Sequence, residues 1–363
     1  MEKHRHVFED FATFERVYDG YRLARRNKRF KPAVLDYSAH LEENMLRDVQ
    51  RLRDGTYAPG EPHDFYELYP KVRLIHSLPF NDRVINCAAY LTLWPIYYRS
   101  MYEHSYGSVP GRGTEAAVHT FQSWLRRVRH EKERWYVCKL DVAKFFFRIP
   151  YEVQLRELGR PLDDPRMMWF LETAIKCDGR PFGLPIEAKD VKTAERVPGI
   201  GMQVGSLISQ MTANVVMTPL DHYIKRVLRV PFYARYMDDM RLIVSSKSEA
   251  WRCVREVDKY LRGELGLQLN QKTAVIPADI PVEFVGRKIS ADRIELRRST
   301  SLSMKRHLAQ IMDGYAEGAL TLEYCKNVIT SYAGMLSHCN NDALRDKVFR
   351  DFVLRRSTAE DGC

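Results

Sequence analysis

The stretch FYARYMDDMRLIV at residues 232–244 consists of two apolar, β-favouring runs on either side of a turn. Asp238 and Asp239 lie side by side in that turn. Because like charges repel, such a pair is stable mainly where a divalent cation or a basic partner neutralises it. Carboxylate oxygens are hard ligands that suit Mg²⁺. Asp is also common in turns for backbone reasons, so a solvated turn is the alternative interpretation.

A third carboxylate follows another β-favouring run, WYVCKLDVAKFFFRI at 135–149. Alternate side chains of a strand share one face, so Asp141 can face a neighbouring hairpin while Val137 and Leu140 help to cover the core. Two metal ions would then bridge Asp141 and Asp238, an arrangement that indicates phosphoryl-transfer chemistry. An ordinary Asp at the end of a strand is the alternative.

With these residues the chain resembles the reverse transcriptases: YMDD at 236–239 and LDVAKFFFRI at 140–149 are similar to the catalytic pair of that family. Other blocks follow in the family's order, from about residue 65 to 295, and the ordered set carries the resemblance. They are PKVRLIHSLPFNDRVI at 70–85 (basic fingers segment), SYGSVPGRGTEAA at 105–117 (fingers–palm block), GIGMQVGSLISQMTAN at 199–214 (template and nucleotide pocket), GLQLNQKT at 266–273 (a Lys near the triphosphate) and VEFVGRKI at 282–289 (primer-grip hairpin).

The resemblance implies an α+β fold shaped as a right-hand polymerase, with fingers, a palm built on an antiparallel sheet, and a helical thumb. We expect a helical N-terminal region at 1–60 and fingers with a fingers–palm helix at 61–135. The palm should span 136–295 and include an extended insertion at 176–199, which is rich in Pro and Gly. A helical thumb and C-terminal tail should fill 296–363.

Apolar spacing predicts several helices. One is expected over 7–26, a second over 40–54, and a third from Asn81 to Tyr98 that Pro95 kinks or ends. From about residue 300 the pattern predicts short helices. The last of these should begin at 340–342 and end at Arg355 and Arg356.

The resemblance also implies roles for charged residues. Asp141 and Asp238 should hold two Mg²⁺ ions, with Mn²⁺ as a substitute, helped by the backbone carbonyl of Val142, while Asp239 supports the geometry. On a short strand-like segment, Lys71 and Arg73 point the same way and would clamp the β- and γ-phosphates. Lys272 would neutralise or protonate the leaving pyrophosphate. For each of these three basic residues, plain surface charge is the alternative.

The nucleotide pocket is expected to include Phe146, Gln203, Val204 and Gly205. Phe146 occupies the position where the family places an aromatic ring under the sugar, which would clash with a 2′-hydroxyl, although a core Phe is the competing explanation. Where most reverse transcriptases read Pro-Gln-Gly, this chain has Gln203-Val204-Gly205. Losing a hydrogen-bonding group beside the base should lower fidelity.

Contacts to template and primer are expected from Arg112, Ser209, Gln210, Tyr236, Met237 and Gly286. Val204 and the Ser209-Gln210 pair, where Ser-Pro is more usual, resemble the reverse transcriptases of diversity-generating retroelements, as does the short length. The 176–199 insertion and Gln203 are less typical of that type. Related reverse transcriptases serve in antiphage defence, some with a dedicated noncoding RNA and some extending DNA from a protein side chain, so both roles stay open.

Composition agrees with a polyanionic partner, since the 363 residues carry a formal net charge of +10. We therefore expect an RNA template, structured and noncoding, a DNA or RNA primer, and deoxynucleoside triphosphates. The run RLARRNKRFK at 22–31 would touch template backbone or form a solvated basic face. An accessory protein or a homo-oligomer is left open.

The chain shows no sign of a membrane or secretory route. No apolar stretch approaches the roughly 20 residues of a membrane span, and the N-terminal sequence lacks a signal-peptide apolar region. A cytoplasmic protein is the expectation. The seven cysteines are scattered and never form a C-x-x-C pair, which predicts reduced thiols.

Two other functions fit the sequence less well than DNA synthesis. A nucleic-acid binding protein with a catalytically dead palm has no need to keep clustered acids beside a polyanion. An RNA-templated RNA polymerase is disfavoured by the ring of Phe146.

Overall fold

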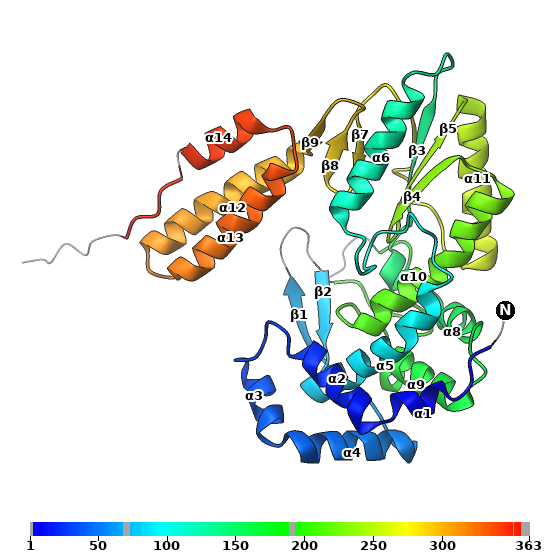
Figure 1. Cartoon of the computed structure of the whole chain (residues 1–363), viewed down its shortest axis with the longest axis vertical. Coiled ribbons are helices and arrows are strands. Elements are labelled where there is room, and N and C mark those ends of the chain that lie inside the picture. Colours follow the sequence, from blue (N-terminus) through cyan, green and yellow to red (C-terminus); the bar gives the residue numbers. More distant parts are fainter. Residues whose placement is uncertain (1–2, 68–72, 189–192, 351, 357–363) are drawn as a thin grey trace, which may run out of the picture.

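The computed structural model of the chain describes residues 3–67, 73–188, 193–350 and 352–356, with a helical base, a central antiparallel sheet above it and a group of helices at one side (Figure 1). The helices are α1 (Val7–Phe11), α2 (Phe14–Ala24), α3 (Pro32–Ala39), α4 (Leu41–Arg53), α5 (Phe80–Tyr98), α6 (Thr114–Val128), α7 (Phe145–Arg148), α8 (Tyr151–Gly159), α9 (Pro165–Lys176), η1 (Cys177–Gly179), α10 (Leu207–His222), η2 (Tyr223–Val227), α11 (Lys247–Glu264), α12 (Arg298–Ala316), α13 (Leu322–Ser337) and α14 (Asp342–Arg350). Within the described ranges, no helix is both long enough and apolar enough to cross a membrane.

The strands form three antiparallel sheets. They are β1 (His63–Glu67) with β2 (Arg73–Ser77), a four-stranded sheet in the order β4 (Phe232–Tyr236), β5 (Asp239–Val244), β3 (Tyr136–Asp141) and β6 (Ala274–Pro277), and a three-stranded sheet of β7 (Val282–Phe284), β8 (Arg287–Ile289) and β9 (Ile294–Leu296).

The prediction of one continuous helix over 7–26 is wrong, because this stretch forms two helices, α1 and α2. Thr13 caps α2, since its hydroxyl accepts a hydrogen bond from the Arg16 N–H at 3.2 Å. Thr is favoured at such a cap and is a poor residue inside a helix.

Helices α4 and α5 confirm the predictions over 40–54 and 81–98. Pro95 does not end α5, which continues to Tyr98. It lies close to the end of the helix, where few intrahelical hydrogen bonds remain to be lost. Helix α5 packs against both α2 and α10, and α10 in turn packs on the sheet, so the two helices together connect the helical base to the sheet.

The four-stranded sheet lies within the range expected for the palm, and it is covered on both faces. Leu140 and Leu242 pack with α10 and α11 on one face, whereas Val137 and Ile243 pack with α6 and the β7–β9 sheet on the other. This alternation follows the period of two along each strand. In the described residues, the cysteines are free thiols, as their spacing predicts, and all but Cys339 are buried.

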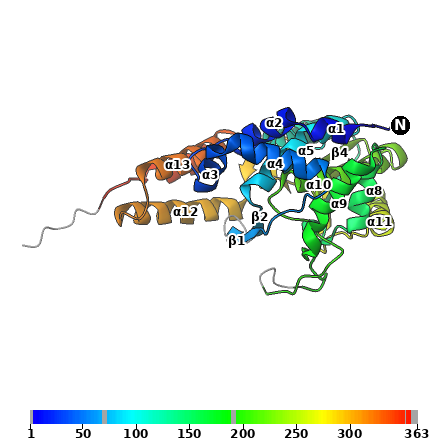
Figure 2. The same cartoon turned by 90° about the horizontal axis from the view of Figure 1, so that it is seen from below.

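The C-terminal helices are longer than predicted. Helices α12 and α13 run side by side (Figures 1 and 2) and have 19 and 16 residues, so the expectation of short helices is wrong. The last helix, α14, starts at Asp342 and ends at Arg350 rather than at Arg356. Asn340 and Asn341 stay outside it, because their side chains accept hydrogen bonds from the β9 backbone at 2.9 and 2.8 Å.

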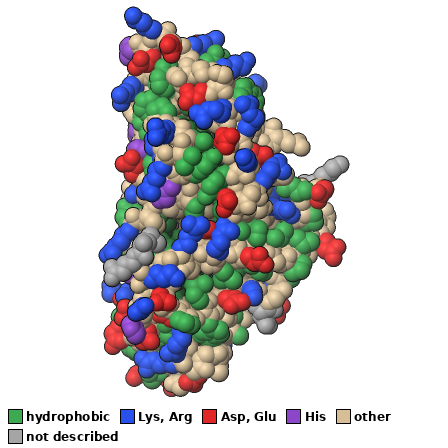
Figure 3. All heavy atoms as spheres, turned by 90° about the vertical axis from the view of Figure 1, so that its right-hand side faces the viewer, with side chains coloured by type: hydrophobic (Ala, Val, Ile, Leu, Met, Phe, Trp, Pro, Cys, Tyr) green, Lys and Arg blue, Asp and Glu red, His purple; other side chains and the backbone are tan. Residues whose placement is uncertain are grey.

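Basic side chains are spread over the face of the molecule that includes α11, with acidic side chains between them (Figure 3). On this face, therefore, the net charge of +10 is not gathered into one patch.

Candidate active site

Most of the predicted site residues line one large cavity of about 850 Å³, together with residues of β2 and the β7–β8 hairpin. The predicted residues that line it are Asp141, Phe146, Gln203, Val204, Gly205, Ser209, Gln210, Tyr236, Met237, Asp238, Asp239, Lys272 and Gly286. The predicted residues that meet here are up to 145 positions apart in the sequence, from Asp141 to Gly286.

Two predicted residues, Val142 and Arg112, are not among the described residues that line this cavity. The Val142 side chain is buried, and the Arg112 guanidinium donates to the carbonyl oxygen of Tyr102 at 2.8 Å. Arg73 begins β2, but its side chain, like all of Lys71, lies outside the described residues. Their predicted roles stay predictions.

The acidic residues come from two adjacent strands. Asp141 ends β3 and is the register partner of Asp239, which begins β5, with Asp238 in the turn before it. Met237 adopts a left-handed backbone at φ 57° to make this turn. Gly107 packs against the turn so closely that a Cβ there would lie 2.7 Å from the Met237 nitrogen. Gly107 therefore belongs to the site, as the wall against which the acidic turn forms.

Asn270 holds Asp141 in place and was missed by the sequence analysis. Its Nδ2 donates to Asp141 Oδ2 at 3.0 Å and its backbone N–H donates to the Asp141 carbonyl at 2.7 Å. Its Oδ1 accepts the backbone N–H of Lys272 at 3.1 Å. The sequence signal was present in LNQKT, but only its Lys was singled out.

Arg241 pairs with Asp239 and was also missed. Its guanidinium forms an ion pair with the Asp239 carboxylate and donates through Nε to the Glu283 carbonyl at 2.9 Å. In the part of the chain that the structure describes, no three His, Cys, Asp or Glu side chains form a ready-made metal cluster. Because Arg241 already neutralises the Asp239 carboxylate, that ion pair favours a supporting role for Asp239.

A buried ion pair lies beneath the acidic turn. Arg235 and Asp221 are joined at 2.6 Å with both side chains fully buried, and Arg235 also donates to the Met237 carbonyl at 3.1 Å. Tyr233 donates to Asp221 at 2.6 Å. Burial, and then the Asp221 charge, raises the pKa of Tyr233, so its phenol remains a donor. This network fixes the backbone from which Asp238 projects.

One side of the cavity is built from α7 and the segment 199–206, called the pocket segment from here on. Phe145 is buried in the core, while Phe146 is half-buried and lines the cavity, with the two ring centroids 5.3 Å apart. The Val204 carbonyl accepts the backbone N–H of His76 in β2 at 3.0 Å. The Phe146 side chain therefore faces the cavity, whereas Phe145 belongs to the core.

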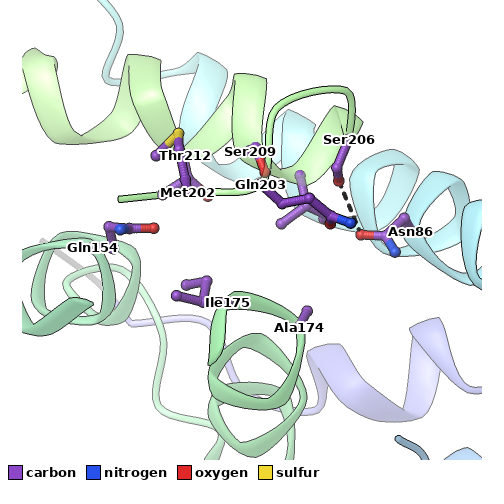
Figure 4. Close-up of a pocket in the computed structure, with 10 residues that line it drawn as sticks. Asn86, Gln154, Ala174, Ile175, Met202, Gln203, Ser206, Ser209 and Thr212 are labelled. Atoms are coloured by element: carbon purple, nitrogen blue, oxygen red, sulfur yellow. Dashed lines mark hydrogen bonds between the residues drawn. The ribbon is translucent and has the colours of Figure 1, made fainter. Parts of the chain in front are cut away.

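Gln203 lines the large cavity and has further contacts below the pocket segment. Its side chain is buried, donates to the His76 carbonyl at 3.4 Å, and also lines a small enclosed cavity of about 10 Å³ below the pocket segment. Figure 4 shows Gln203 beside Ser206, whose hydroxyl is hydrogen-bonded to Asn86. The Gln203 amide therefore supports the pocket segment from within.

Known proteins with similar sequences match the part of the chain that contains this site. Residues 65–289 match the family model described as "Reverse transcriptase (RNA-dependent DNA polymerase)". Protein YkfC of Escherichia coli K12 is 24% identical over 275 residues, which cover 65% of this chain and 69% of that protein. The putative COX1/OXI3 intron 1 protein of Saccharomyces cerevisiae is 22% identical over 263 residues, which cover 58% of this chain and 30% of that protein.

Two solved telomerase structures are also similar, at 14% and 13% sequence identity and a TM-score of 0.46 each. One is from Candida albicans, in complex with a fragment of telomeric RNA, and the match covers 80% of this chain and 54% of the telomerase chain. The other is from Candida tropicalis, and the match covers 71% of this chain and 60% of the telomerase chain. Because the family model spans more than half of the chain and includes Asp141, the pocket segment and the YMDD turn, the chain belongs to the reverse transcriptase family, with its right-hand polymerase fold.

Proposed function

We propose that the protein is an RNA-directed DNA polymerase that adds deoxynucleotides to a primer 3′-hydroxyl. The observation that carries the proposal is the convergence of Asp141 and Asp238 from two strands in one cavity, with Phe146 and Lys272 on its walls. A primer end placed beside the two acids would meet a nucleotide whose sugar lies over Phe146. Lys272 would balance charge on the departing pyrophosphate.

The residues present fit a divalent cation. Asp141 and Asp238 supply carboxylate oxygens, and Asn270 and Arg241 fix the acids on either side. The Asp141 carbonyl points toward the Asn270 backbone, so the next carbonyl, that of Val142, is expected on the opposite side, toward β5. These groups would hold Mg²⁺, or Mn²⁺ in its place, which would lower the pKa of the primer hydroxyl and neutralise the triphosphate.

Phe146→Val is expected to weaken the rejection of ribonucleotides. Removing the ring opens space for a 2′-hydroxyl, and the ratio of kcat/KM for dTTP to that for UTP should fall by about 10- to 100-fold. Phe147→Val is the matched control, since Phe147 also lines the cavity. If only the Phe147 variant lost discrimination, Phe146 would not be the sugar gate.

Val204→Gln is expected to reduce misincorporation by about 2- to 10-fold, the effect of one added hydrogen bond beside the base. Val204 lines the cavity and follows the buried Gln203, so the new amide would reach the nucleotide. Error spectra opposite each template base measure the effect, and Val204→Leu controls for side-chain size. Equal spectra for wild type and Val204→Gln would remove the proposal of lowered fidelity.

The biological role that we favour is copying a structured noncoding RNA in a diversity-generating retroelement, because Val204 and Gln210 match that type. The second role is antiphage defence, with a dedicated RNA or a protein primer, which the insertion at 176–199 and Gln203 favour. Sequencing the nucleic acid that copurifies with the protein, then extending it with labelled deoxynucleotides, separates the two. A template repeat paired with a variable repeat supports the first role, and a structured RNA from a defence island supports the second.

A further inference from the structure

The insertion is tied to the helix that carries the sugar gate. Residues 180–188 contain no helix or strand, yet they lie against α7. The Lys144 ammonium, just before α7, donates to the Ile186 carbonyl at 2.8 Å, and the Arg148 guanidinium at its end donates to the Leu184 carbonyl at 3.1 Å. Both ends of α7 are therefore fastened to the insertion.

The same insertion is tied to the pocket segment. Within the insertion, Gly183 and Val197 exchange two backbone hydrogen bonds of 3.1 Å, which hold residues 180–188 beside the stretch that leads into the pocket segment. Gly201 passes so close that a Cβ on it would lie 2.8 Å from the Gly183 nitrogen, and its φ of +90° suits glycine. The pocket segment thus rests on the insertion through backbone contact.

A chain of side chains connects the insertion to the β1–β2 hairpin. Arg180 pairs with Asp64 at 3.2 Å, and the other oxygen of Asp64 accepts from His76 Nδ1 at 2.8 Å. Asp64 and His76 are register partners across the hairpin. The ring of Phe182 meets the His76 ring edge to face, with centroids 4.9 Å apart.

His76 sits where these parts meet. A carboxylate only accepts, so Nδ1 carries the proton toward Asp64, and Nε2 is buried and finds no partner among the described residues. Burial lowers the pKa of the imidazole, which agrees with a neutral ring. On its backbone side, His76 donates to the Val204 carbonyl and accepts from Gln203. One residue thereby joins the hairpin, the insertion and the pocket segment.

We propose that residues 180–188 are an internal brace for the nucleotide pocket, latched to the fingers by the Arg180–Asp64–His76 chain, and that His76 is a positioning residue for the incoming deoxynucleotide. The proposal rests on the polymerase function above, since it concerns the same pocket. In this proposal the insertion supports the pocket within the molecule and does not serve as a docking loop for a partner.

Steady-state incorporation of dTTP on an RNA template tests the latch. His76→Phe keeps the aromatic contact with Phe182 but loses the donor to Asp64, and the KM for dTTP should rise about 10-fold while kcat stays within about threefold. His76→Asn places an amide N–H where Nδ1 lies, and should keep the KM within about threefold of wild type. The dissociation constant for primer–template should not change in either variant.

Matched variants distinguish loss of the Arg180–Asp64–His76 chain from a general loss of folding. His63→Phe changes an exposed His on the same hairpin and should leave KM unchanged. Arg180→Gln breaks the latch at a half-exposed position and should raise KM even if His76→Phe fails to fold. A lower kcat at unchanged KM in both His76→Phe and Arg180→Gln would overturn the brace. Absence of dTTP incorporation by the wild type would instead overturn the polymerase function.

Discussion

Asp238→Asn is expected to lower deoxynucleotide incorporation at least about a thousandfold, the effect of losing ~4 kcal/mol of transition-state stabilisation. The substitution keeps the shape of the side chain but removes the charge that would hold a divalent cation opposite Asp141. Single-turnover extension of a labelled primer on an RNA template measures the loss. Raising the Mg²⁺ concentration should not restore the rate.

Thermal unfolding and a surface variant serve as controls for Asp238→Asn. The Tm should stay level or rise, because removing one of two adjacent acids relieves repulsion. Asp292→Asn changes an exposed acid that pairs with Arg129 outside the cavity, and surface pairs contribute little, so its activity should match wild type. Undiminished incorporation by Asp238→Asn would mean that the acidic turn is structural only.

Arg235→Met is expected to cost about 3–5 kcal/mol of unfolding free energy, because it leaves the Asp221 carboxylate buried without its partner. The loss also removes the hydrogen bond to the Met237 carbonyl, so the acidic turn loosens and activity falls. Urea unfolding followed by fluorescence measures the stability.

The double variant Arg235→Met/Asp221→Leu provides the control for this pair. Removing both charges leaves no unpaired ion, so most of the lost stability should return. Activity should stay low in the double variant, since the Met237 carbonyl still lacks its donor. A double variant as unstable as Arg235→Met would show that the buried charge is not the cause.

The sequence predicted the sheet and its acids because both signals are local. Two β-favouring apolar runs specify a hairpin, and Asp238 and Asp239 fall at its turn because they lie between the two runs. Strand periodicity allowed Asp141 to face the hairpin, and the resemblance to the family supported its pairing with Asp238. Register pairing of Asp141 with Asp239 then placed the three acids together.

The supporting residues could not be predicted, because their roles depend on burial and on partners distant in sequence. Arg241 and Asn270 look like ordinary polar residues until Asp239 and Asp141 are placed beside them. A basic residue inside an apolar strand run, such as Arg235 in FYARY, was the available signal, since an unpaired buried charge is costly. His76 gave no signal, because its side-chain partner Asp64 became visible only with the hairpin register.

Iron-directed cleavage of the backbone would test most directly whether Asp141 and Asp238 share one cation site. With added hydrogen peroxide and ascorbate, Fe²⁺ substituted for Mg²⁺ reduces the peroxide to hydroxyl radicals that cut the chain next to the bound ion, independently of DNA synthesis. The convergence of β3 and the YMDD turn predicts paired cuts close to residues 141 and 238, which excess Mg²⁺ suppresses and Asp141→Asn abolishes at both places. Cuts at one of the two positions alone, or paired cuts that persist in Asp141→Asn, would contradict a shared site.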